Sequence, residues 1–127
     1  MVYNERICFF AYIYSFFLVW WSKMAKESPY QAKLIKKIKR MFPGCIVLKN
    51  DSGYIQGIPD LTILYKNFWA VLEVKASHNS SQQPNQDYYI DQLGDMSYAA
   101  YIYPENEEAV LRDLQLTFGL SRPTRIS

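Results

Sequence analysis

The chain has few of the residues that build disulfide frameworks or zinc sites. Its 127 residues include two cysteines, Cys8 and Cys45, in no CxxC pattern, and a single histidine, His78. Two isolated cysteines do not make a disulfide framework, and with one histidine they lack the spacing of a structural zinc site. The composition therefore fits a reducing compartment, and we expect a cytoplasmic protein.

The sequence also lacks a strong charge bias. Its net charge is only +2, so the charge of the whole protein does not argue for a polyanionic partner. Half of the residues are apolar, which argues against low-complexity disorder. This length favours one domain with one modest core.

No hydrophobic run reaches the roughly 20 residues that a membrane-spanning helix needs. The longest uncharged run, Ile7 to Trp21, is followed by no signal-peptide cleavage pattern. Three interpretations stay open: a membrane anchor or interfacial segment, an arm that packs on the domain or on another subunit, or a region upstream of a natural start at Met24. We favour the third, because the rest of the chain needs nothing from this segment. Residues 1–23 are then an apolar extension and residues 24–127 the domain, with no stable membrane association.

After this segment the pattern becomes regular and predicts seven elements. Ser28 and Pro29 resemble the start of a helix that Pro43 and Gly44 end. Apolar runs separated by turn residues predict four strands, and apolar stripes at helical spacing predict two further helices. The predicted order is a helix to Phe42, strands Cys45–Leu48, Leu61–Tyr65 and Phe68–Lys75, a helix Asn85–Met96, a strand Ala99–Tyr103 and a helix Glu107–Phe118. This order predicts an α/β fold with one four-stranded sheet flanked by helices.

Two carboxylates and a lysine stand out around the hairpin of the second and third strands. Side chains alternate along a strand, so Glu73 and Lys75 share one face while Val74 points into the core. A turn at Lys66-Asn67 would set Asp60 opposite Glu73, with Cβ atoms about 4.5–5.5 Å apart. Adjacent carboxylates repel unless one is protonated or a cation lies between them.

Mg²⁺ suits such a pair, because it prefers oxygen ligands and keeps waters for chemistry. Lys75 beside the ion could orient or deprotonate an attacking water and balance developing charge. The alternative is an ordinary ion pair at the edge of a sheet, which is the usual meaning of an isolated E-x-K in a strand.

Gly57-Ile58-Pro59-Asp60, followed by Glu73-Val74-Lys75, resembles the motif of the PD-(D/E)XK nuclease superfamily, and within it the virus-type replication–repair nucleases (VRR-NUC). The resemblance covers about residues 27–115 and implies a restriction-endonuclease-like αβββαβ core with a mixed sheet. It implies that Asp60, Glu73 and the Val74 carbonyl bind the metal. It also implies catalytic roles for Asp60, Glu73, Lys75 and Gln86.

The same resemblance implies that Glu27 is an outer metal ligand from the first helix. Two alternatives remain there. The capping pattern sets Glu27 just before the helix, and family members often carry an acidic residue where this chain has Gln31. Either Glu27 reaches the metal, through water if need be, or the acid of the first helix is weakened in this protein.

The function that the resemblance implies is Mg²⁺-dependent cleavage of DNA phosphodiester bonds, with Mn²⁺ as a substitute. We expect branched or otherwise structured DNA as substrate, as for a Holliday-junction resolvase in DNA repair or recombination, and the host cytoplasm if the source is a phage or other virus. Because a domain this small has room for one active site, we expect a homodimer. The alternatives are a nucleic-acid-binding module without catalysis and a membrane-tethered interaction protein.

Several further residues are candidates for contact with nucleic acid. Five basic residues fall within eight positions, and they predict either a phosphate-facing surface or a solvated helix face. A polar loop near the carboxylates offers phosphate contacts or is a solvated turn. Tyrosines late in the chain either stack bases or pack in the core or between subunits, and His78 is a general base, a phosphate contact or neither. These candidates are Lys33, Lys36, Lys37, Lys39 and Arg40, the loop residues Lys49, Asn50, Ser52 and Tyr54, and the tyrosines Tyr88, Tyr89, Tyr98, Tyr101 and Tyr103.

Overall fold

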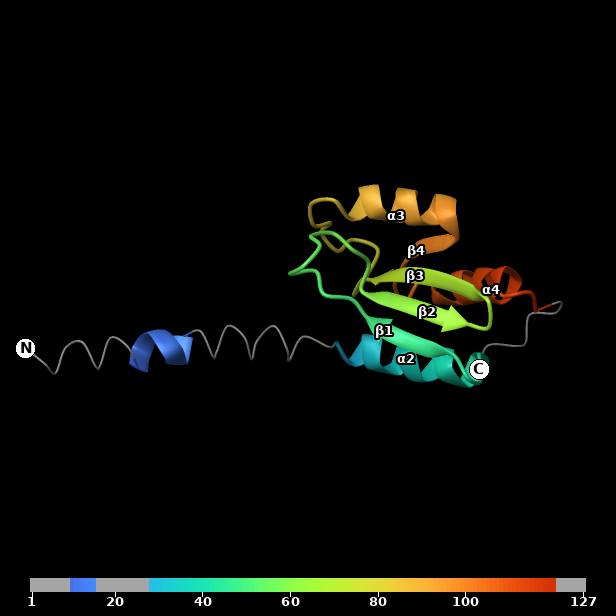
Figure 1. Cartoon of the computed structure of the whole chain (residues 1–127), viewed down its shortest axis with the longest axis horizontal. Helices are drawn as coiled ribbons and strands as arrows, with labels where there is room; N and C mark the ends of the chain where they lie inside the picture. Colours follow the sequence, from blue (N-terminus) through green and yellow to red (C-terminus); the bar gives the residue numbers. More distant parts are fainter. Residues whose placement is uncertain (1–9, 16–27, 121–127) are drawn as a thin grey trace, which may run out of the picture.

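The computed structural model describes residues 10–15 and 28–120 (Figure 1). Residues 10–15 form a short helical segment, and the rest of the Ile7–Trp21 run lies outside the described residues, as does Glu27. Predictions for those positions are therefore not tested. The elements of the main body are α2 (Pro29–Met41), β1 (Ile46–Lys49), β2 (Leu61–Tyr65), β3 (Phe68–Val74), α3 (Gln86–Met96), β4 (Tyr98–Ile102) and α4 (Glu107–Thr117).

The four strands form one mixed sheet in the order β1-β2-β3-β4. The pairs β1–β2 and β2–β3 are antiparallel, and β3–β4 is parallel. The predicted α/β class, with a mixed four-stranded sheet flanked by helices, is confirmed. The predicted hairpin register is confirmed as well, because Leu61 pairs with Leu72 and Tyr65 pairs with Phe68. Lys66 makes the turn with a φ of 55°.

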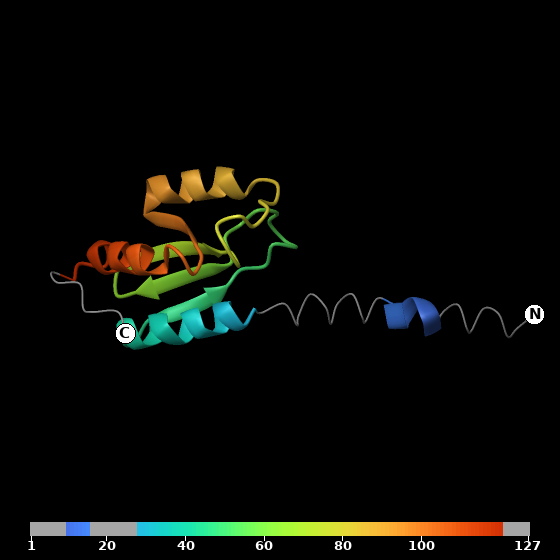
Figure 2. The ribbon, with the colours of Figure 1, turned by 180° about the vertical axis from the view of Figure 1, so that it is seen from behind.

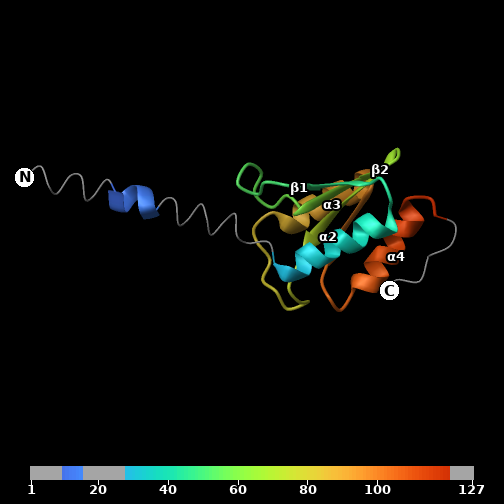
Figure 3. The same ribbon diagram turned by 90° about the horizontal axis from the view of Figure 1, so that it is seen from below.

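Helices α2 and α4 cover one face of the sheet, which we call the inner face (Figure 3). Leu34 and Ile38 of α2 and Leu111 and Leu114 of α4 are almost fully buried there. They share one core cluster with the inward-facing side chains of β2, β3 and β4. The predicted apolar stripes of both helices are thus the ones that build the core.

An aromatic cluster closes the core at the hairpin end of the sheet. The Phe42 ring lies 5.4 Å from the Tyr65 ring and 5.0 Å from the Phe118 ring, between ring centroids. Edge-to-face and tilted pairs at such distances add about 0.5–1.5 kcal/mol beyond the burial of apolar area. These aromatic contacts therefore stabilise the hairpin end of the sheet.

The opposite, outer face is covered differently. Helix α3 lies over β3 and β4, where a Cβ on Gly94 would be 3.8 Å from the Ala99 Cβ (Figure 3). None of the residues of α3 belongs to the core cluster. On β1 and β2 this face leaves Ile46 and Leu64 exposed. The outer face thus has much less apolar packing than the inner one.

Local signals set the element ends close to the predicted positions. The Ser28 hydroxyl accepts a hydrogen bond from the Gln31 N–H at 3.1 Å, so the predicted helix cap is confirmed. The fourth strand begins at Tyr98 rather than Ala99, because the parallel ladder already pairs Tyr98 with Ala70. None of the helices described over 10–15 and 28–120 is long and apolar enough to cross a membrane.

Candidate active site

Two loops meet at the end of the sheet where β2 begins and β3 ends (Figures 1 and 2). Gly57 adopts a φ of +90°, and a Cβ there would lie 2.6 Å from the Asn85 carbonyl carbon and 2.7 Å from the Pro84 oxygen. Only glycine fits such a contact with neighbouring backbone. Pro59 is fully buried behind it. The Gly57–Asp60 loop is therefore held against the loop that leads into α3.

This packing brings Asp60 and Glu73 together, as the predicted register requires. The Asp60 N–H donates to Glu73 Oε2 at 3.1 Å, and the Val74 N–H donates to Asp60 Oδ2 at 2.9 Å. Each carboxylate is thus held by a backbone N–H that belongs to, or directly follows, the other acidic residue. The two acids are interlocked, and Glu73 is only 4% exposed.

Gln86 and Lys75 complete the network around Glu73. The Gln86 Nε2 donates to Glu73 Oε1, and the Gln86 Oε1 accepts from Lys75 Nζ at 2.6 Å and from the Gln83 N–H at 2.9 Å. Lys75 Nζ also donates to the Ser81 carbonyl at 3.0 Å and lies 3.8 Å from Glu73 Oε1. The structure therefore brings Asp60, Glu73, Lys75 and Gln86, all predicted site residues, into one hydrogen-bonded group. We call it the carboxylate cluster.

The carboxylate cluster carries more negative charge than its single ammonium balances. Burial and, to a lesser extent, the neighbouring Asp60 together raise the pKa of Glu73 to about 7, although Lys75 acts in the opposite direction. Burial also raises the pKa of Asp60, against the Val74 N–H and Lys75. These shifts mean that two ionised carboxylates are costly here unless another cation joins them.

The donor chemistry of the carboxylate cluster fits a hard divalent ion. Both acids offer oxygens, and Asp60 Oδ1 has no hydrogen-bond partner among the described residues. Mg²⁺ is typically held by one or two carboxylates and completed by waters. Within residues 10–15 and 28–120 no group of three or more His, Cys, Asp or Glu residues gathers as a metal site. In the described part of the chain, the carboxylates that could hold such an ion are those of Asp60 and Glu73.

Asn50, predicted as a phosphate contact, is engaged within the protein. Its Nδ2 donates to the Pro59 carbonyl at 2.7 Å, and its amide also bonds the Thr62 hydroxyl at 2.9 Å. Its backbone N–H donates to the Asp60 carbonyl at 2.8 Å. Asn50 thus fixes the chain on both sides of Asp60, which is a positioning role.

The other predicted nucleic-acid contacts are spread over β1, the turn that follows it and α2. Lys49 ends β1, and Ser52 and Tyr54 are exposed in the following turn. On α2, Lys36 and Arg40 are exposed, whereas Lys37 is paired with Glu107 of α4. The structure does not bring the basic stretch and the acidic pair into one group.

Of the five tyrosines named as candidates, two lie beside the carboxylate cluster, and the sequence did not distinguish them from the other three. The parallel register sets Tyr101 of β4 opposite Glu73. Tyr101 and Tyr103 line a pocket together with Lys75, whereas Tyr88 is exposed on α3 and the Tyr98 hydroxyl donates to Asp113. Only the pairing of β4 with β3 distinguishes Tyr101 and Tyr103 from the other tyrosines, and the sequence carries no signal for that register.

Scans of the whole chain against protein-family models, curated proteins and solved structures find no match.

Proposed function

We propose that this protein is a Mg²⁺-dependent endonuclease that hydrolyses phosphodiester bonds in DNA, built on a restriction-endonuclease-like core. The observation that carries the proposal is the interlocked pair of Asp60 and Glu73, buried beside Lys75 and Gln86. The resemblance of the Gly57–Asp60 and Glu73–Lys75 motifs to the VRR-NUC family supports the same reading.

The contacts of Lys75 argue against an ordinary ion pair. An ion pair would aim the ammonium at a carboxylate, but Lys75 Nζ is 3.8 Å from Glu73 and makes shorter bonds to the amide of Gln86 and the carbonyl of Ser81. A buried acid left without close charge compensation costs several kcal/mol. Two such acids side by side therefore favour a site for an additional cation.

Asp60, Glu73 and the Val74 carbonyl would hold the Mg²⁺, with Mn²⁺ as a substitute. When bound, such an ion supplies Lewis-acid polarisation of the phosphate and lowers the pKa of a water. The chain itself fixes the geometry, since Gln86 bonds Glu73 and Lys75 at once. Lys75 thereby presents a fixed positive charge where negative charge develops on the phosphate, and that kind of preorganised stabilisation is often the largest catalytic contribution.

The proposal includes branched or otherwise structured DNA as substrate and a homodimer as the active form. Residues 28–120 hold one carboxylate cluster, and cutting both strands of a junction needs two. The exposed basic residues Lys36 and Arg40 of α2 offer phosphate contacts outside the carboxylate cluster.

The test is cleavage of linear, nicked, flapped and four-way DNA with and without Mg²⁺. We expect Mg²⁺-dependent cutting that falls by at least about a thousandfold in Asp60→Ala and Glu73→Ala, since oxyanion-type stabilisation alone is worth about 10²–10³. Glu108→Ala is the matched control, because that carboxylate is exposed on α4 and paired with Arg112. Cleavage that persists in both site variants would refute the proposal. Salt-sensitive binding without cleavage under any divalent ion would select the non-catalytic module instead.

A further inference from the structure

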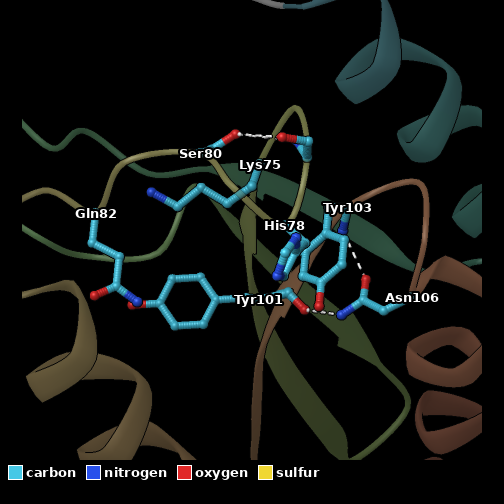
Figure 4. A pocket seen from close by; sticks show the side chains of 8 residues that line it. Lys75, His78, Ser80, Gln82, Tyr101, Tyr103 and Asn106 are labelled. Atoms are coloured by element: carbon cyan, nitrogen blue, oxygen red, sulfur yellow. Dashed lines mark hydrogen bonds between the residues drawn. The ribbon is translucent and has the colours of Figure 1, made fainter.

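A pocket of about 240 Å³ opens directly beside Lys75 (Figure 4). It lies on the outer face next to the carboxylate cluster, with which it shares Lys75. The side chains that matter for its chemistry are Lys75, His78, Ser80, Gln82, Tyr101 and Tyr103.

The parallel pairing of β3 and β4 explains why aromatic rings stand here. Because Tyr101 pairs with Glu73, Tyr103 follows on the same face, level with Lys75. Asn106 then fixes this end of β4, since its Oδ1 accepts from the Tyr103 N–H at 2.8 Å and its Nδ2 donates to the Tyr101 carbonyl at 3.0 Å. The backbone that carries both rings is therefore preorganised.

The two rings differ in what holds them. Tyr101 is held by two contacts. Its hydroxyl donates to Asp87 at 2.6 Å, and Lys75 Nζ lies over its ring at 5.8 Å from the ring centroid. The Tyr103 ring lies beside the His78 ring, at 6.3 Å between centroids and an angle of 55°. Within residues 28–120, His78, Gln82 and the Tyr103 hydroxyl make no hydrogen bond, so their polar edges are available to a ligand.

The chemistry of the lining defines the ligand class. The pocket holds one cation, Lys75, no carboxylate, and aromatic faces next to hydroxyl, imidazole and amide groups. Such a lining suits a flat, hydrogen-bonding ring joined to an anion. A nucleobase attached to its phosphate has this form, with the phosphate on the side of Lys75.

We infer that the pocket receives one unpaired base next to the phosphodiester that is cut. This inference rests on the proposed nuclease function and sharpens its substrate. A base already unpaired enters without the few kcal/mol that extrusion from a duplex costs. The protein thus selects junctions, bulges, gaps and ends over continuous duplex by this pocket.

The experiment uses the full chain and 2-aminopurine, a fluorescent base that is quenched when it stacks. One duplex carries 2-aminopurine as a single-nucleotide bulge, and the other carries it paired with thymine. No divalent ion is added, so that the DNA stays intact. We expect tighter binding of the bulge with quenching, and a loss of about tenfold in Tyr103→Ala, as for removal of one stacking ring. His78→Ala, a change at an exposed residue, should also weaken binding of the bulge.

Two controls separate stacking from general damage. Tyr103→Phe keeps the ring and should bind the bulge within about threefold of wild type. Tyr88→Ala removes a tyrosine that is 57% exposed on α3 and outside the pocket, and should change nothing. Equal affinity for bulged and paired DNA, or bulge binding that is indifferent to both Tyr103→Ala and His78→Ala, would overturn the inference.

The outcomes also separate this inference from the proposed function. Cleavage that requires Asp60, together with bulge binding that is indifferent to both Tyr103→Ala and His78→Ala, would refute the pocket and keep the nuclease. Bulge binding that requires Tyr103, without cleavage under any divalent ion, would keep the base pocket and refute the nuclease.

Discussion

The two faces of the sheet are built from the same strands, but one holds the apolar core and the other holds the candidate active site. The inner face buries Leu72, Leu61 and Ile102 under α2 and α4, in one apolar cluster. The outer face carries Glu73 of β3 and Lys75 directly after that strand, and both are held to α3 through Gln86. Neighbouring residues of β3 thus belong alternately to the core and to the candidate active site.

The difference shows how a small domain separates stability from chemistry. Apolar burial is worth about 25 cal/mol per Å² and needs no directional bonds, so the inner face supplies most of the stability. On the outer face the buried charges cost free energy, which hydrogen bonds only partly offset. The inner face offsets that cost. Its core cluster is complete without any residue of α3, so the charges beside α3 do not interrupt the apolar packing.

The largest expected effect comes from changing one neighbour on each face of β3. Leu72→Ala should lower the free energy of unfolding by about 2–5 kcal/mol, because it empties a fully buried core position. Glu73→Gln should instead keep the fold and abolish Mg²⁺-dependent cleavage. Denaturant titration and cleavage assays on both variants check this. Loss of activity in Leu72→Ala under conditions where it stays folded, at the level of Glu73→Gln, would contradict the separation of faces.

The loop that presents Asp60 offers a second test with a matched pair of glycines. Gly57 and Gly44 both have positive φ, but a Cβ on Gly57 meets the backbone of Asn85 at 2.6 Å while one on Gly44 meets nothing within 4 Å. Gly44→Ala should therefore cost about 1–2 kcal/mol from backbone strain alone. Gly57→Ala should cost about 3 kcal/mol, because the overlap adds to that strain.

Activity distinguishes the same two variants further. Gly57→Ala should also reduce cleavage by moving Asp60, which Gly44→Ala leaves in place. Equal stability and equal activity of the two variants would show that the contact between the loops does not position the acid.

The pH dependence of stability tests the cost of the buried acids. A pKa raised from 4.5 to about 7 means that folded Glu73 binds its proton more tightly than unfolded Glu73. Stability of the metal-free protein should therefore fall as the pH rises through 4.5–7 and stay lower above that window. The loss from Glu73 is about 3 kcal/mol, at 1.36 kcal/mol for each pKa unit.

Denaturant titrations of wild type and Glu73→Gln between pH 4.5 and 8 isolate this contribution. The difference between the two proteins should shift by about 3 kcal/mol in favour of Glu73→Gln across the window. Saturating Mg²⁺ should remove much of the wild-type loss, since bound cation stabilises the ionised acids. A difference that is flat with pH would contradict the buried, ionisable pair.

Much of the fold could be predicted because its signals are local. The stripes of α2 and α4, the cap at Ser28 and the turn at Lys66-Asn67 all act within a few residues, and the turn fixes the hairpin register. The same register predicts that Asp60 and Glu73 meet. A side-chain period of two and a known turn leave little freedom there.

The rest of the site depends on contacts between distant segments, which local patterns do not encode. Asn50 reads as a solvated loop residue, yet it holds Pro59 and Thr62. Tyr101 and Tyr98 are indistinguishable in sequence, and only the parallel ladder sets Tyr101 beside Glu73. The bond from Lys75 to the Ser81 carbonyl likewise depends on how the loop before α3 folds back.

Direct titration of the protein with a divalent ion tests the central claim, that the outer face holds Asp60 and Glu73 as a cation site. Calorimetry with Mg²⁺ and with Mn²⁺ should show saturable binding to the wild type at pH 8, weaker binding at pH 6, and none to Asp60→Asn or Glu73→Gln. Glu108→Gln should bind as the wild type does. Unchanged binding in both site variants, or no binding to the wild type at pH 8, would contradict the account.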